Sequence, residues 1–197
     1  MCGIVAVAGR HPDPELLDAA AIAAGRRGPH SHGWAWSMPD GWGLAYGAGP
    51  LTGTTAPMIG PVVLAHSRLA TSGARPGDLS SPTEGQPLRA GSVVLAHNGT
   101  VPGANTVVDS EELLHVLCGS SDPLSVRVER ALRLCPRATA LAAADGSEVV
   151  VARRGGDRRV GQPLWRLDAG GVVYVASRPF HAACALLVEG VVRLEAA

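Results

Sequence analysis

Short apolar segments separated by turn residues dominate this 197-residue sequence, and helical patterns are confined to two places. Segments 62–66 and 93–97 are too short for helices, and they are rich in the β-branched residues that favour strands. Helices that cluster between blocks of hairpins are typical of α+β proteins, whereas a regular alternation of strand and helix would indicate a parallel sheet. The sequence therefore predicts an α+β fold with mainly antiparallel sheets.

Capping and turn residues predict where the elements begin and end. The segment Asp13-Pro14-Glu15 supplies an N-cap, a first-turn proline and a first-turn acid, which predicts a helix that Gly25 closes. Pro39-Asp40-Gly41 joins the alternating segments 34–38 and 42–46 as a hairpin. Further helices are expected over 111–117 and after Asp122-Pro123, a polar loop over 72–85, and further strands over 5–8, 62–66, 93–97, 139–143, 148–152, 164–167 and 172–176.

Charge and composition exclude several classes of function. The 17 basic and 17 acidic residues give a formal net charge of zero, so the basic patch expected for binding to nucleic acid or an anionic membrane is missing. Every basic residue is arginine, which excludes a P-loop lysine and a Schiff-base lysine. The N-terminus has no basic region of a signal peptide, and no apolar run approaches the ~20 residues of a membrane span.

The spacing of the four cysteines favours a reducing compartment and gives no indication of a metal site. Cys2, Cys118, Cys135 and Cys184 show no C-x-x-C spacing and no close pairing. Neither a zinc site nor a dense disulfide framework is expected from this arrangement. We therefore expect a cytoplasmic protein that uses no metal and no cofactor.

Cys2 is the sharpest candidate for chemistry. Removal of the initiator methionine leaves a cysteine that carries both a thiol and a free α-amine. The amine has an ordinary pKa near ~8, so it can accept the thiol proton without help from a histidine. The alternative is a small apolar residue at the start of a buried strand, and for a lone cysteine this alternative is the more common one.

Three other positions each allow a functional and a structural interpretation. The amide of Asn98 and the N–H of Gly99 are two potential donors to an oxyanion, but Asn-Gly is also the commonest signal of a tight hairpin turn. Arg68 has the planar fork that binds a carboxylate, or it is a solvated surface residue. Asp109 can bind an ammonium group, or it caps a helix with Glu112 in a capping box.

Six further segments accompany Cys2-Gly3-Ile4, and together they resemble the class II glutamine amidotransferases, whose N-terminal-nucleophile glutaminase domain begins Cys-Gly-Ile. The segments lie in the order found in that family and extend over nearly the whole chain. They are 26–33 (similar to R-G-P-D-x-x-G), 64–73 (H-x-R-x-A/S-T), 86–88 (Q-P-F), 95–99 (H-N-G), 109–111 (D-S/T-E) and 174–179 (A-S-E-P). This resemblance implies one glutamine amidotransferase type 2 domain over 1–197, folded as a four-layer αββα sandwich of two mainly antiparallel sheets.

The resemblance also implies a role for each matching residue. Cys2 attacks the side-chain amide of glutamine and forms a glutamyl thioester with release of ammonia. Asn98 and Gly99 hold the oxyanion, and Arg68, Asp109 and Thr71 bind the substrate: Arg68 the α-carboxylate, Asp109 the α-amine, with Thr71 lining the same pocket. A zwitterionic amino acid needs one cation and one anion, which agrees with this assignment. His66 and His97 are expected to be structural, because no pair at i, i+4 and no carboxylate cluster accompanies them.

Two departures from the family pattern bear on the function. His30 stands where many members have aspartate, and Thr100 replaces the glutamate that follows H-N-G in asparagine-synthetase types. No acceptor domain is recognised within these residues, so the first hypothesis is a glutaminase that delivers ammonia to a separate synthetase. The second is a stand-alone γ-glutamyl amidohydrolase that acts on a γ-glutamylated metabolite. The third is a non-catalytic binding domain of the same fold.

Overall fold

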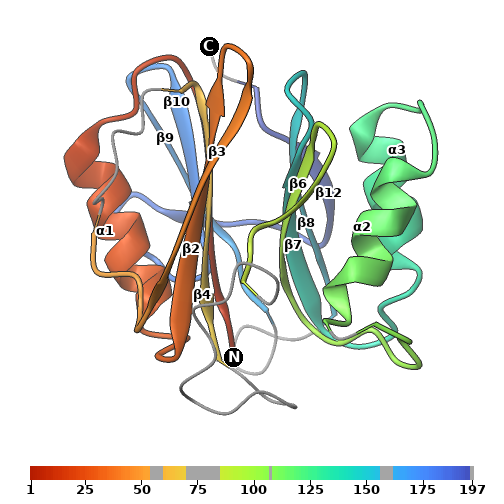
Figure 1. Cartoon of the computed structure of the whole chain (residues 1–197). Helices are drawn as coiled ribbons and strands as arrows, with labels where there is room; N and C mark the ends of the chain where they lie inside the picture. The colour runs from red at the N-terminus through yellow and green to blue at the C-terminus, as the bar shows by residue number, and fades with distance from the viewer. Residues whose placement is uncertain (54–59, 70–84, 107, 156–161, 196–197) are drawn as a thin grey trace.

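Two antiparallel sheets form the middle layers of the structure, and helices cover their outer faces (Figure 1). This computed structural model describes residues 1–53, 60–69, 85–106, 108–155 and 162–195. Among these residues the helices are α1 (Pro14–Gly25), α2 (Ser110–Cys118) and α3 (Leu124–Leu132). In Figure 1, α1 lies on one side of the molecule, and α2 and α3 lie on the other. The predicted four-layer α+β sandwich is confirmed.

Every strand pairing in the described residues is antiparallel, as predicted. The first sheet contains, in order across it, β11 (Ala185–Leu186), β9 (Trp165–Ala169), β10 (Val172–Ala176), β1 (Gly3–Ala8), β4 (Val62–Arg68), β2 (Ser31–Met38) and β3 (Gly41–Ala48). The second contains β12 (Gly190–Arg193), β8 (Val149–Arg154), β7 (Thr139–Ala144), β6 (Val93–Asn98) and β5 (Leu88–Ala90). The short strands β5, β11 and β12 were not predicted, because two to four residues are too few for an alternating pattern to be visible.

The central strands are buried on both faces, which explains why they read as continuous apolar runs. In β1, side chains 4, 6 and 8 lie between the two sheets, and side chains 5 and 7 pack beneath α1. In β7, Leu141 and Ala143 face α2 and α3, whereas the even-numbered residues face the other sheet. The layer between the sheets is rich in alanine, and small side chains allow two sheets to approach closely. This close approach brings the end of β6 next to the start of β1.

The start of β1 is packed tightly against the last turn of α1. A Cβ atom added to Gly3 would lie 2.1 Å from the carbonyl oxygen of Ala24. Glycine is therefore required at position 3, where the two backbones approach closely.

The first turn of α1 is capped as predicted. The Asp13 carboxylate accepts a hydrogen bond of 2.8 Å from the Glu15 N–H.

Two buried histidines connect the sheets. The Nε2 of His66 in β4 lies 3.1 Å from the carbonyl oxygen of His97 in β6, so this nitrogen carries the proton. The Nδ1 of His66 is buried with no hydrogen-bond partner in the part of the chain described. Burial lowers the pKa of His66 to about 3 and that of His97 to about 4, and both side chains are neutral at pH 7.

We predict that Gly3→Ala destabilises the protein by about 1–3 kcal/mol, because the new methyl group must displace the end of α1. Urea unfolding measures this change in the free energy of unfolding. Gly119→Ala is the matched control: Gly119 has φ −76, and the nearest atom to its added Cβ is 3.3 Å away. Equal stabilities for the two variants would contradict the close contact.

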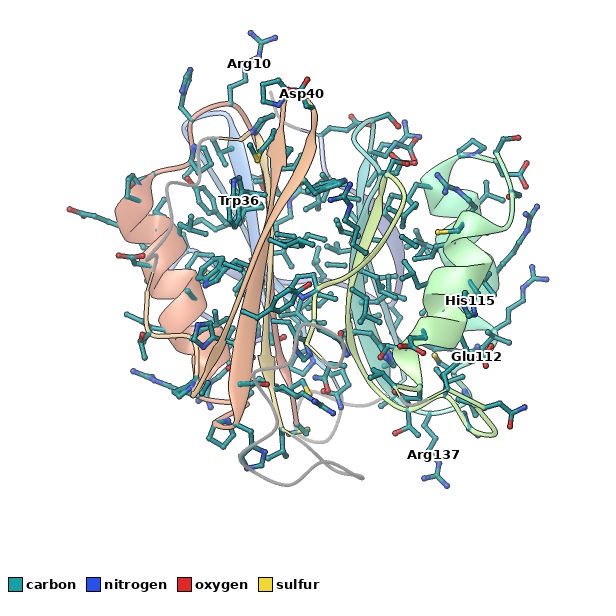
Figure 2. The ribbon with its side chains drawn as sticks, viewed as in Figure 1. Arg10, Trp36, Asp40, Glu112, His115 and Arg137 are labelled. Carbon is teal, nitrogen blue, oxygen red and sulfur yellow. The ribbon has the colours of Figure 1, made fainter. Side chains whose placement is uncertain are left out.

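The neutral histidines predict that stability falls as pH falls from about 6.5 toward 4. In that range the unfolded chain binds protons at His66 and His97 with an ordinary pKa of 6.5, whereas the folded chain does not. The unfolded state is therefore favoured, by about 1.4 kcal/mol per pH unit for each histidine. We expect His66→Gln to reduce the measured slope by about that amount. His115→Gln, at an exposed position on α2 (Figure 2), is the control and should keep the wild-type slope.

Candidate active site

The backbone of Cys2 is held in place from both sheets. Cys2 immediately precedes β1, whose first residue pairs with Ser67 of β4. From the other sheet, the Asn98 carboxamide at the end of β6 makes two hydrogen bonds to Cys2: its Oδ1 accepts from the Cys2 N–H at 3.2 Å, and its Nδ2 donates to the Cys2 carbonyl at 2.8 Å. The Nε of Arg27 donates to the same carbonyl at 2.9 Å. These hydrogen bonds hold Cys2 through its backbone and do not use its thiol.

The Cys2 thiol lies against the end of β4. The backbone N–H of Leu69 donates to Cys2 Sγ at 3.4 Å. Burial raises the pKa of the thiol, while the Leu69 N–H, the N-terminal ammonium group, Arg68 and Arg27 act in the opposite direction. The thiol therefore needs a nearby base to become a nucleophile at neutral pH.

One pocket of about 510 Å³ brings together most of the predicted site residues. Cys2, Arg68, Gly99 and Asp109 all line it, although they come from four different parts of the sequence. Thr71 lies outside the described residues. Asn98 is next to the pocket: its carboxamide is bound to the backbone of Cys2 and, through Nδ2, to the Oε1 of Gln162 at 2.5 Å. Both Nδ2 hydrogens of Asn98 therefore already have acceptors.

The alternative interpretations of two site residues are wrong. Asn98-Gly99 does not form a hairpin turn, because β6 pairs with β5 and β7 and the chain passes from Gly99 into a longer connection to α2. Asp109 makes no side-chain cap to α2. Instead its Oδ2 accepts a hydrogen bond of 2.8 Å from the Val101 N–H, which holds the carboxylate beside the loop that lines the pocket.

A network of buried polar groups supports the wall of the pocket. The His97 N–H donates to Gln86 Oε1 at 2.6 Å, and its ring nitrogens lie 2.8 Å from Ser110 Oγ and 2.9 Å from Thr139 Oγ1. Gln86 Nε2 also donates to Ser110 Oγ at 3.1 Å. The contact with Ser110 connects the end of β6 to the start of α2. His97 is neutral and both of its ring nitrogens are hydrogen-bonded, as expected for a structural histidine.

One residue of this site, Gln162, was not predicted from the sequence. It lies two residues before Leu164 in the irregular segment that leads into β9, and its Oε1 accepts hydrogen bonds from Arg27 Nη2 at 2.7 Å and from Asn98 Nδ2. No local pattern distinguishes this glutamine from other polar turn residues, so only the folded structure shows its contacts. Arg27 lies in the predicted motif segment 26–33, but its hydrogen bond to the Cys2 carbonyl was not predicted.

A second hollow in the described part of the structure contains none of the predicted site residues. This larger hollow of about 1010 Å³ adjoins the β2–β3 hairpin and includes Trp36 and Asp40. Figure 2 shows Asp40 at the end of the molecule away from the N-terminus, whose place Figure 1 marks. In the described part of the chain, no group of three or more His, Cys, Asp or Glu side chains is arranged to hold a metal ion. No helix there is long and apolar enough to span a membrane.

Comparison with solved structures identifies the fold. No protein-family model and no curated protein matches the sequence. Glutamine phosphoribosylpyrophosphate amidotransferase from B. subtilis is 21% identical with a TM-score of 0.70, and the match covers 99% of this chain and 49% of that one. This chain therefore spans about half the length of that enzyme.

Two other solved structures match over nearly their whole length. A glutamine aminotransferase class-II domain protein from Silicibacter pomeroyi is 15% identical with a TM-score of 0.56, and the match covers 98% of both chains. A predicted glutamine amidotransferase from Pseudomonas aeruginosa is 16% identical with a TM-score of 0.58, over 98% of this chain and 97% of that one. The chain thus has the fold of the class II glutamine amidotransferase domains, which is the N-terminal-nucleophile hydrolase fold that the sequence motifs predicted.

Proposed function

We propose that this protein hydrolyses the side-chain amide of glutamine and delivers the ammonia to a separate synthetase. The observation that carries the proposal is a single pocket whose lining includes Cys2, Arg68 and Asp109, which supply one thiol, one guanidinium group and one carboxylate. A free amino acid presents one anion and one cation at its α-carbon, and a pocket with one charge of each sign can bind both. The matching fold of the glutamine phosphoribosylpyrophosphate amidotransferase supports the same activity.

The proposed reaction begins with removal of Met1, which converts the Cys2 nitrogen into an α-amine. The neutral amine takes the thiol proton, and Sγ attacks the amide carbon of glutamine. Collapse of the tetrahedral intermediate breaks the carbon–nitrogen bond, and the amine returns the proton so that ammonia leaves. Water, deprotonated by the same amine, then hydrolyses the glutamyl thioester to glutamate and restores the thiol.

We assign the remaining residues by their positions around the thiol. The Gly99 N–H and the Asn98 carboxamide stabilise the oxyanion, and Asn98 does so by exchanging one of its two present acceptors for the substrate oxygen. Arg68 binds the α-carboxylate and Asp109 the α-amine. Thr71 is assigned to the same subsite only from the resemblance of segment 64–73 to the family motif. All four cysteines are free, and a reducing cytoplasm would keep Cys2 in its thiol form.

Covalent labelling tests the nucleophile. We predict that the glutamine analogue 6-diazo-5-oxonorleucine adds once to protein that has lost Met1, and that Cys2→Ala abolishes the adduct. Intact mass reports both the processing and the label. A form with a non-cleavable tag before Cys2 is the matched control, since it keeps the thiol but has no α-amine, and it should stay unlabelled. A processed wild type that takes no label would favour the non-catalytic alternative.

Substrate affinity tests the two charged residues. We predict that Arg68→Gln and Asp109→Asn each raise the KM for glutamine by roughly tenfold to a hundredfold, because each removes a charge-assisted hydrogen bond to the substrate. Initial rates of glutamate formation over a range of glutamine concentrations measure this effect. Unchanged KM values would contradict the assigned subsites. Cleavage of other γ-glutamyl amides by a wild type that leaves glutamine intact would favour the amidohydrolase alternative.

A further inference from the structure

Gln162 occupies a central position in the hydrogen bonds behind Cys2, and the reaction above gives it no role. Its Oε1 lies between two donors, Arg27 Nη2 at 2.7 Å and Asn98 Nδ2 at 2.5 Å. Arg27 and Asn98 both donate in turn to the carbonyl oxygen of Cys2. The side chain is partly buried and, unlike Arg68 or Asp109, is not part of the substrate pocket wall.

The contacts from Arg27 to Gln162 and from Gln162 to Asn98 determine which way the oxygen of each carboxamide points. A guanidinium group only donates hydrogen bonds, so Arg27 requires the oxygen of Gln162 to face it. That oxygen then requires the NH2 end of Asn98, because two oxygens cannot share a hydrogen bond. With its NH2 end directed to Gln162 and the Cys2 carbonyl, Asn98 presents Oδ1 to the Cys2 nitrogen at 3.2 Å.

We propose that Gln162 is a positioning residue that fixes the orientation of the Asn98 carboxamide and, through it, the α-amine of Cys2. This inference rests on the proposed function to the extent that the Cys2 nitrogen becomes an amine when Met1 is removed. An amine that donates a hydrogen bond to Asn98 Oδ1 is held beside its own thiol. The same contact stabilises the protonated amine and therefore the thiolate that forms with it.

Other charged and titratable groups surround Cys2 and are left unchanged by the neutral substitution Gln162→Met. They are Arg27 after α1, with Arg178 near it, Arg68 at the end of β4, His97 in β6, and Asp109 at the start of α2. A change in the reactivity of Cys2 on substitution of Gln162 alone can therefore be assigned to the hydrogen bonds of Gln162.

The test compares Gln162→Met, which has similar length but removes the carboxamide oxygen, with Gln162→Glu, which keeps an oxygen acceptor. Alkylation of Cys2 by iodoacetamide is followed from pH 5 to pH 10 by mass spectrometry of the N-terminal peptide. We expect Gln162→Met to move the profile to higher pH and to slow alkylation at pH 7 by roughly tenfold, as for the loss of a hydrogen bond to a charged group. Gln162→Glu should stay within about threefold of wild type.

The exposed Cys118, the last residue of α2, is an internal control in every sample, since it makes none of the contacts in question and its rate should not change. A Gln162→Met profile that superimposes on the wild type, or parallel changes at Cys2 and Cys118, would overturn the proposal. So would retention of Met1 in the wild type, because no amine would then exist to be oriented. Iodoacetamide needs no glutamine pocket, so a wild type that reacts with it but not with the diazo-ketone would refute the glutaminase and leave the role of Gln162 measurable.

Discussion

The pair of hydrogen bonds between Asn98 and the backbone of Cys2 is the contact on which the site depends. It joins the end of β6 in one sheet to the start of β1 in the other, at distances of 3.2 and 2.8 Å. The sheets can come this close because alanine fills much of the layer between them. The position of Cys2 therefore depends on how the two sheets pack in the core.

The strand and helix pattern of the sequence was sufficient to predict an α+β fold with antiparallel sheets, and the family resemblance added the four layers. Continuous apolar runs such as 93–97 and the capped start at Asp13 have local causes, and the structure confirms both. The edge strands β11 and β12 were not predicted, since their pairing depends on neighbours that are distant in sequence. The helix after Asp109 was also predicted, but the carboxylate of Asp109 was open to two interpretations until its contact with Val101 was known.

The site was only partly predictable, and the reason is physical. Cys2, Arg68, Gly99 and Asp109 occur in motifs, and the fold places them around one pocket. Gln162 has no motif, because its importance comes from two donors that belong to segments 64 and 135 residues away along the chain. Contacts of this kind are created by the sheet packing and leave no periodic or local signal. The same holds for Thr139, whose hydroxyl lies 2.9 Å from the buried ring of His97.

The central claim is that Cys2 forms a covalent thioester with the glutamyl group of its substrate. The most direct measurement is to mix the processed protein with glutamine, quench in acid within the first turnovers, and determine the mass of the N-terminal peptide. We predict a glutamyl adduct on Cys2 that hydroxylamine removes and that Cys2→Ala lacks. Turnover of glutamine without any such adduct, or with undiminished rate in Cys2→Ala, would contradict it.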